Sequence, residues 1–303
     1  MFFYSGYTPL SVVTAAGLIA VLIILNEIAR RSKYAGIAAF IIVPVVFSIF
    51  VWPATAEQST WFAWVKTYSA LAGVLGFMAF RYIPSLQNKK AMILFPSLIL
   101  IVNILEAIAR DFEVYGLSGA ELVSEGLQPG PWNIINGVAG ILLVLSMSGF
   151  FGVKVARTKS KDMIWADQTW FWIIAYTLWN ISFCYNTIPL RSFYTGPLLN
   201  LTAVFIGFFI MRGAWLQHRA QTLAFFAMFS LILPRYDKLP LFSITSSGNT
   251  DAMLILSLLA LSANAAVFSY GLFQILKRKR NPLTQDLYSH LKNHKAILEL
   301  NSL

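Results

Sequence analysis

The sequence predicts an all-α, polytopic helical membrane protein of about nine transmembrane helices, with the N-terminus outside and the C-terminus inside. Three observations support this prediction. Apolar runs of about 20 residues recur along the chain, which is the length that a membrane helix needs. The composition is 57% hydrophobic and only 12% charged, whereas soluble domains carry about 25% charged residues. Basic residues fall in every second connection.

Each apolar run must be helical, because lipid offers no partner for an unpaired backbone group. The runs occupy most of the 303 residues and leave no room for a second, soluble domain. We therefore expect a single bundle over residues 1–280 and an amphipathic tail over residues 281–303. The expected spans are approximately Leu10–Ala29, Gly36–Trp52, Trp61–Ile83, Ala91–Ala109, Trp132–Val155, Trp165–Tyr185, Thr195–Met211, Trp215–Leu233 and Ala252–Leu276.

The alternation of basic and non-basic connections follows the positive-inside rule and gives the orientation. The expected inner connections hold the Lys and Arg residues of Arg30–Lys33, Arg81–Lys90, Lys154–Lys161, Arg212–Arg219 and Lys277–Arg280. The net charge of +10 is then an orientation signal. It implies attraction to anionic lipid at the inner face of the bilayer, and no nucleic-acid partner is expected.

Ionisable and amide side chains inside a span are costly and often mark a pathway or a binding site. We expect an outer cluster of Lys66, Asn103, Glu106, Arg110, Asn133, Asn136, Asn180, Tyr185 and Arg191. Lys66 and Glu106 come out at similar depths, so we predict an ion pair between them, because either charge alone would be unpaired in a low dielectric. The alternatives are that Lys66 extends to the outer interface and that Glu106 pairs with Arg110.

A second, inner cluster is expected from Asn26, Glu27, Asp167, His218 and Arg219. The alternative interpretation of Glu27 is that it only pairs with Arg30 or Arg31 at the membrane interface. The alternative interpretation of Asp167 is that it stands at the start of its helix, where the helix dipole favours a carboxylate. His218 has the one side chain near a span that ordinarily titrates close to neutral pH.

The C-terminal segment Pro282–Leu303 is expected to form an amphipathic helix on the inner membrane surface. Its apolar face would consist of Leu283, Leu287, Leu291 and Leu298. His290 and His294 stand at i and i+4, but two histidines without a third ligand do not predict a metal site. No metal, haem or nucleotide motif is present in the sequence, so the cofactor is left open.

Five long segments carry the most specific sequence patterns: LNEIARRSKYAGIAAF (25–40), WVKTYSALAGVLGF (64–77), NILEAIARDFEVY (103–115), WFWIIAYTLWNISFCYN (170–186) and GAWLQHRAQTLAF (213–225). They resemble a family of bacterial multi-span membrane proteins that is known only as a domain of unknown function. The resemblance runs along nearly the whole chain. It implies a single helical bundle in the bacterial plasma (inner) membrane, and it supplies no activity, substrate or catalytic residue.

Polar clusters at both ends of the bundle favour a transporter or channel for a small solute or ion, with Glu27 and Glu106 as coupling or gating charges. The first alternative is a membrane-embedded enzyme that acts on a lipid or a quinone-like substrate, with the aromatic-rich segment Trp165–Tyr185 as a platform. The second alternative is a membrane sensor or scaffold that signals through its tail. The sequence names neither the solute nor the oligomeric state.

Overall fold

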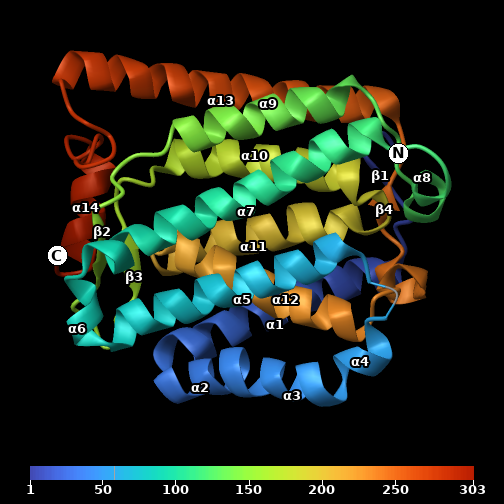
Figure 1. The fold of residues 1–303 in the computed structure, drawn as a ribbon, viewed down its shortest axis with the longest axis horizontal. Helices are drawn as coiled ribbons and strands as arrows, with labels where there is room; N and C mark the ends of the chain where they lie inside the picture. Colours follow the sequence, from blue (N-terminus) through green and yellow to red (C-terminus); the bar gives the residue numbers. More distant parts are fainter. Residues whose placement is uncertain (58) are drawn as a thin grey trace.

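The computed structural model describes residues 1–57 and 59–303, and most of the regular structure is helical. Figure 1 shows the long helices side by side, with the two termini at opposite ends of the bundle. We call these the N-terminal end and the C-terminal end. The α-helices are α1 (Pro9–Arg31), α2 (Lys33–Ile37), α3 (Val43–Phe50), α4 (Trp52–Thr55), α5 (Trp61–Tyr82), α6 (Pro84–Gln87), α7 (Lys90–Gly116), α8 (Ala120–Glu125), α9 (Pro131–Leu145), α10 (Trp170–Thr187), α11 (Leu199–Phe205), α12 (Trp215–Ile232), α13 (Thr250–Arg278) and α14 (Lys292–Leu300).

Short helical turns of other types link or extend these helices. The π-helical turns are η1 (Ala38–Ile42), η3 (Tyr194–Leu198) and η4 (Ile206–Ile210), and the 3-10 turns are η2 (Pro189–Arg191), η5 (Tyr236–Lys238) and η6 (Pro240–Phe242). The segment from η3 through α11 to η4 is therefore one interrupted helix. Pro197 lies inside η3, where its missing N–H prevents a regular hydrogen-bond ladder.

Within the described residues, five helices are long and apolar enough to cross a membrane, judged by length and composition. They are Pro9–Arg31, Lys33–Phe50, Trp61–Tyr82, Lys90–Gly116 and Thr250–Arg278. Two further apolar segments, Pro131–Leu145 and Tyr194–Ile210, are shorter. Together with α10 and α12, these helices correspond to all the segments that the sequence predicts as spans. The count of nine spans and their orientation stay predictions.

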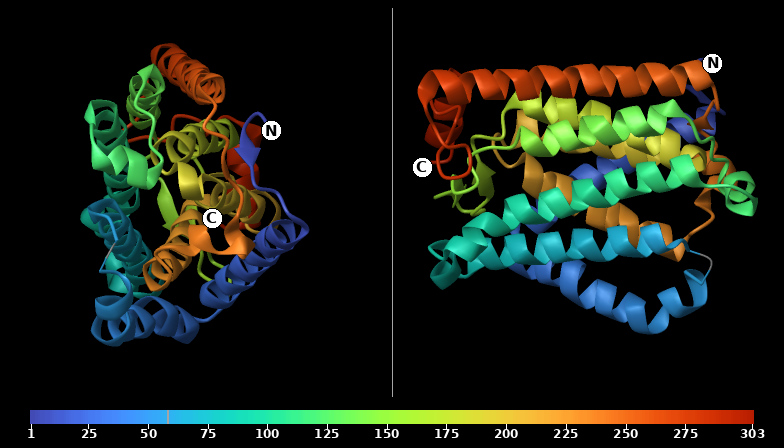
Figure 2. Two further views of the ribbon diagram at one scale, coloured as in Figure 1. Left: turned by 90° about the vertical axis from the view of Figure 1, so that its right-hand side faces the viewer. Right: turned by 45° about the horizontal axis from the view of Figure 1, so that its top comes forward.

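The helices α10 and α11 lie near the middle of the bundle. Figure 2 (left), which looks along the helices, shows them surrounded by α13, α9, α7, α5 and α1. On α10 both Trp179 and Asn180 are buried, and on the neighbouring α12 so are His218 and Arg219. These side chains face other helices. Helices α10 and α12 can therefore carry polar groups that hydrogen-bond to neighbouring helices.

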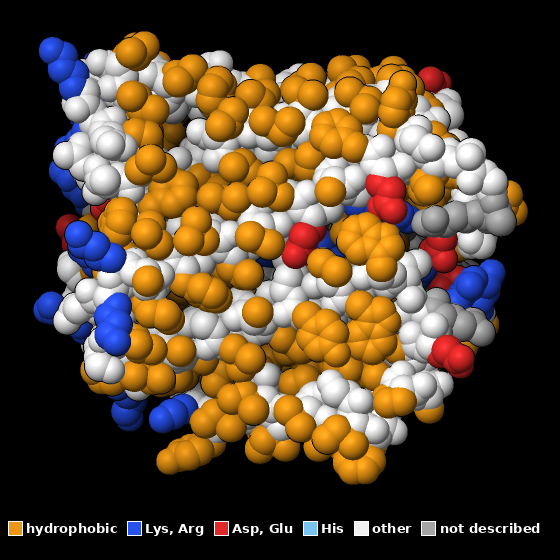
Figure 3. Space-filling model, in the orientation of Figure 1, with side chains coloured by type: hydrophobic (Ala, Val, Ile, Leu, Met, Phe, Trp, Pro, Cys, Tyr) orange, Lys and Arg blue, Asp and Glu red, His pale blue; other side chains and the backbone are white. Residues whose placement is uncertain are grey.

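The surface of the bundle is divided by residue type. An apolar belt covers the face seen in Figure 3, and Lys and Arg side chains gather mainly at the C-terminal end. Ile24, Leu105 and Leu276 are among the large apolar side chains that the long helices expose. Such a contiguous apolar surface marks contact with lipid or another protein.

Two predicted spans are longer than the helices that the structure forms. The expected span Trp132–Val155 ends as a helix at Leu145, and the expected span Trp165–Tyr185 begins as a helix at Trp170. Between them, β2 (Val153–Val155) and β3 (Met163–Trp165) form an antiparallel hairpin at the C-terminal end. The error arises because a short apolar run does not distinguish a buried strand from a helix. A second small sheet, β1 (Tyr4–Ser5) with β4 (Thr245–Ser246), lies at the N-terminal end.

The tail is helical only over α14, so the predicted helix over Pro282–Leu303 is too long. Leu287 and Ile297 are buried at 1% and 4% exposure, and Ile297 belongs to an apolar cluster with Ile164 of the hairpin and Ala214. The apolar side chains therefore pack on the protein, whereas we expected them on the membrane surface. Leu283 stays exposed.

Candidate functional site

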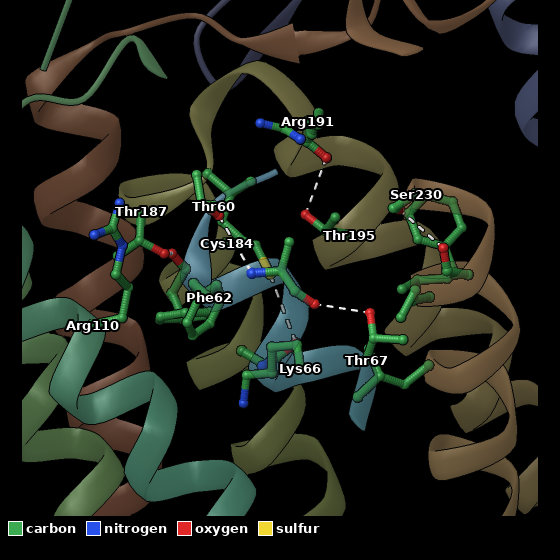
Figure 4. Close-up of a pocket in the computed structure, with 18 of the residues that line it drawn as sticks. Thr60, Phe62, Lys66, Thr67, Arg110, Cys184, Thr187, Arg191, Thr195 and Ser230 are labelled. Carbon is green, nitrogen blue, oxygen red and sulfur yellow. Dashed lines mark hydrogen bonds between the residues drawn. The ribbon is translucent and has the colours of Figure 1, made fainter. Parts of the chain in front are cut away.

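A cavity of about 130 Å³, lined by apolar and charged side chains, lies among α5, α7, α10 and α12, toward the N-terminal end of the bundle (Figure 4). Its wall combines apolar rings such as Phe62 and Phe183 with charged side chains. Thr60, Glu125 and Arg191 line it and are partly exposed, so they lie at its mouth. The charged residues of the described wall are Lys66, Arg110, Glu125, Arg191 and Arg219, so positive charge exceeds negative charge there.

The ion pair predicted between Lys66 and Glu106 is present in the structure. Lys66 Nζ lies 3.0 Å from Glu106 Oε2, and both side chains are about 15% exposed. The ammonium group also donates to the backbone oxygen of Asn103 at 2.6 Å and to its side-chain oxygen at 3.1 Å. Ser69 donates to Glu106 and accepts from Asn103. This network joins α5 to α7 and forms one side of the cavity.

Arg110 and Arg191 each lie beside a carboxylate. The guanidinium of Arg110 is 2.9 Å from Glu113 on the same helix. The guanidinium of Arg191 is 2.8 Å from Glu125 of α8 and 3.9 Å from Asp237. The charge of these two cavity residues is therefore at least partly compensated by their neighbours.

Arg219 differs from the other cations of the cavity. Its side chain is 5% exposed, and its Nη2 donates to Asn180 Oδ1 at 3.2 Å. The guanidinium carbon lies 5.8 Å from the centre of the Tyr176 ring. Its Nε and Nη1 form no hydrogen bond, and no carboxylate among the described side chains lies within ion-pair distance. The sequence grouped Arg219 with the inner cluster, but the structure places it at the cavity.

Asn180 connects three helices at this point. Its side-chain oxygen accepts from Arg219 of α12 and, at 2.7 Å, from Asn200 of α11. Four members of the predicted outer cluster lie outside the described cavity wall: Glu106, which pairs with Lys66 of the wall, and Asn133, Asn136 and Tyr185. The hydroxyl of Tyr185 is 3.0 Å from that of Ser247.

Asn133 and Asn136 instead hold a buried carboxylate that sequence reasoning missed. Asn136 donates to Asp111 at 2.7 Å and Asn133 donates to it at 3.5 Å. The expected span Ala91–Ala109 ends before Asp111, whereas α7 continues to Gly116. The helical spacing contained a signal, because Asp111 stands seven residues after the buried Ile104.

A layer of buried aromatic side chains separates the cavity from the C-terminal end. The rings of Tyr176 and Trp215 lie 4.9 Å apart, and those of Trp172 and Trp215 lie 6.0 Å apart. These residues come one or two turns before Asn180 on α10 and one turn before Arg219 on α12. The partly exposed residues of the cavity wall therefore lie toward the N-terminal end, and these aromatic rings lie on the side toward the other end.

At the C-terminal end the predicted inner residues pair mainly with neighbours. Glu27 binds Arg30 at 2.9 Å and Arg31 at 2.8 Å, as its simpler interpretation expected. Asn26 Oδ1 lies 3.3 Å from His218 Nδ1, which ties α1 to α12. These contacts join the predicted inner residues of α1 to one another and to α12.

The centre of this network is Asp162, which sequence reasoning did not single out. Its carboxylate lies 2.9 Å from Arg30 and 3.7 Å from Arg81, and it accepts from Gln217 at 2.9 Å. Burial alone would raise the pKa of Asp162, but hydrogen bonds from Ser160 and Gln217, together with the two guanidinium groups, hold it below its ordinary value. Asp162 thus fastens the hairpin to three helices.

Asp167 holds the tail on the bundle. It accepts from Ser148 at 2.6 Å and from the backbone N–H groups of Leu287 at 3.0 Å and Tyr288 at 2.7 Å. Burial raises the pKa of this carboxyl, while the hydrogen bonds from Ser148 and Tyr288 act in the opposite direction. Asp167 lies away from the cavity, and its contacts do not involve the start of α10.

The fold and the cavity define a helical bundle with membrane-compatible helices and a buried cationic site. A family model matches residues 7–300, and the chain belongs to this family, which is described as a family of unknown function (DUF5692). The predicted resemblance to a domain of unknown function is thereby confirmed. No curated protein and no solved structure matches the chain.

Proposed function

We propose that this protein is an integral membrane protein that carries a small anion across the membrane, with the cavity as its outward-facing binding site. The observation that carries this proposal is Arg219, a buried guanidinium with two donors unused and no carboxylate beside it among the described side chains. An uncompensated buried charge is strongly destabilising. An anion in the cavity would neutralise it and accept its free hydrogen bonds.

The proposed topology has nine spans: α1, α2–α3, α5, α7, α9, α10, η3–η4, α12 and α13. The concentration of Lys and Arg at the C-terminal end supports an inner position for that end and contact with anionic lipid there. The cavity mouth at the other end then faces outward. We assign the protein to the bacterial plasma membrane.

Two features support a carrier with alternating access. The aromatic layer lies on the inner side of the cavity, and Asn180 links Arg219 to Asn200 of α11. The helix that contains α11 is interrupted by π turns at both ends, and such turns are frequent at functional sites. An anion that competes with Asn180 for Arg219 would loosen α12 from α10 and α11, and so couple occupancy to movement.

The transport test uses the full chain reconstituted in liposomes, with chloride, acetate, succinate and phosphate as probes. We expect saturable uptake of at least one anion. The variant Arg219→Gln should slow it at least about tenfold, since a hydrogen bond to a charged group contributes about 1.5–3 kcal/mol. Arg212→Gln, which removes an exposed guanidinium three residues before α12, is the matched control and should transport normally. No uptake of any probe, or equal rates in both variants, would overturn the proposal.

The topology test uses the single cysteine of the chain. In a Cys184→Ser background, Thr250→Cys at the N-terminal end and Lys159→Cys in the hairpin loop are both exposed positions. An impermeant thiol reagent applied to intact cells should label position 250 and not position 159. The reverse result would contradict the proposed orientation.

A further inference from the structure

Three metal-ligand side chains from distant parts of the sequence meet at the C-terminal end, outside the cavity and the Asp162 network. Asp167 precedes α10, Asp286 lies in the loop after α13, and His294 belongs to α14. One ligand atom from each of them lies within 4.8 Å of the others. The sequence had offered only His290 and His294 as a pair, which lacked further ligands.

The distances within this group suit a single metal ion. His294 Nε2 lies 3.3 Å from Asp286 Oδ2 and 4.0 Å from Asp167 Oδ1. Ligand atoms bonded to one tetrahedral metal at about 2.0–2.1 Å stand roughly 3.4 Å apart. A small closure of the tail toward Asp167 would bring the three atoms to that spacing.

His294 is a buried polar group whose hydrogen bonds are missing. Its side chain is 3% exposed, and neither ring nitrogen forms a hydrogen bond. Its neighbours are the two carboxylates, Asp286 and Asp167, and a buried imidazole that forms no hydrogen bond indicates a ligand that would use one of its nitrogens. Neutral imidazole is a common metal ligand.

The carboxylate of Asp167 is held in the way that metal ligands usually are. Ser148 and the backbone N–H groups of Leu287 and Tyr288 donate to it and set its orientation, and such outer hydrogen bonds are typical of ligating carboxylates. The absence of a side chain at Gly152 leaves room for the Asp286 carboxylate, because a Cβ at this position would lie 2.0 Å from Asp286 Oδ1.

We propose that Asp167, Asp286 and His294 bind one divalent transition-metal ion, Zn²⁺ or Mn²⁺, which clasps the C-terminal tail to the bundle. Two carboxylates and one imidazole form a donor set that suits these ions. The ion balances the two negative charges that the structure brings together. Because two ligands come from the tail and one from the bundle, binding stabilises the docked tail.

The test is titration of the detergent-purified full chain, stripped with a chelator, with Zn²⁺ and separately with Mn²⁺ by calorimetry. We expect one ion per chain for at least one of the metals. Asp286→Asn and His294→Gln should each weaken binding by about 10–100-fold or more, the range seen when groups around a metal are changed. His290→Gln, which alters a histidine outside the group, is the matched control and should bind like the wild type.

Stability and tail accessibility give a readout that is independent of transport. The bound metal should raise the melting temperature and slow proteolysis of residues 281–303 in the wild type and in His290→Gln, but not in Asp286→Asn. Asp286 is 27% exposed in its side chain, so its isosteric change keeps the fold. Equal metal binding in the wild type and His294→Gln, or no binding of either ion by the wild type, would overturn the proposal. His294 and Asp286 would then form a simple ion pair.

Discussion

Arg219 of α12 donates to the side-chain oxygen of Asn180 on α10 at 3.2 Å, and this neutral amide stands where a carboxylate would compensate the charge. The same oxygen accepts from Asn200 at 2.7 Å. The arrangement fixes the position of the guanidinium while leaving its charge available to the cavity. A functional anion site needs both properties, since a rigid donor loses less entropy on binding.

The first prediction concerns the charge at position 180. Asn180→Asp keeps the acceptor for Arg219 and Asn200 and adds a negative charge next to the guanidinium. We expect the affinity for the transported anion to fall by about tenfold or more, because a close like charge opposes binding by about a kcal/mol or more. The melting temperature should stay near that of the wild type, since the new carboxylate is paired. Asn88→Asp at an exposed position is the control, and the measurement is anion binding to the purified protein. Unchanged affinity would argue against Arg219 as the anion contact.

The second prediction concerns the ion pair between α5 and α7. Lys66→Met or Glu106→Gln alone should lower the free energy of unfolding by about 3 kcal/mol, because each leaves a mostly buried charge unpaired. The double variant should lose less than the sum of the two single changes. Unfolding in detergent by denaturant measures the coupling energy, and Lys89→Met at an exposed site should be neutral. Additive effects would mean that the 3.0 Å contact contributes no coupling.

The ion pair between Lys66 and Glu106 was predictable because the sequence indicates how deep each residue lies in the bundle. Lys66 and Glu106 lie in neighbouring antiparallel helices, so counting residues from the helix ends gives their depth. The rotation of a helix about its axis is harder to infer. Gln217, His218 and Arg219 follow one another on α12 and yet contact the hairpin, α1 and α10 respectively. Because of this divergence, the sequence does not predict that Arg219 lies at the cavity.

Contacts made by loops were the least predictable. Asp162 and Asp167 both lie in the segment 146–169, which we expected to be partly helical, and most of their partners come from residues far away in the sequence. The apolar residues of β2 and β3 extend the apolar runs of the neighbouring helices, so the sequence pattern does not predict a hairpin there. The metal-ligand group depends on the same segment and was therefore not expected.

The third prediction concerns pH and Asp162. Its folded-state pKa lies below the ordinary value of 3.8, so the contribution of this carboxylate to stability is fully present above that value and is lost as pH falls through the folded pKa. The difference in unfolding free energy between the wild type and Asp162→Asn should be constant above about pH 5 and shrink toward about pH 3. Denaturant unfolding in detergent at a series of pH values measures it. Asp251→Asn at an exposed site is the control. A difference that grows with falling pH would contradict the assigned direction.

The fourth prediction concerns the close contact between α7, α9 and α10. A Cβ at Gly140 of α9 would lie 2.7 Å from Ile108 Cγ1 and 2.8 Å from Trp179 Nε1, so Gly140→Ala forces two buried side chains to move. We expect a loss of about 1–3 kcal/mol in unfolding free energy, as overpacking a tight site usually produces. Gly17→Ala on α1 is the matched control, because no atom lies within 4 Å of the added carbon. Alanine has the higher helix propensity, so this control should be neutral or stabilising by up to about 1 kcal/mol. If both variants unfold alike, the helices α7, α9 and α10 pack less closely around Gly140 than the distances to Ile108 and Trp179 require.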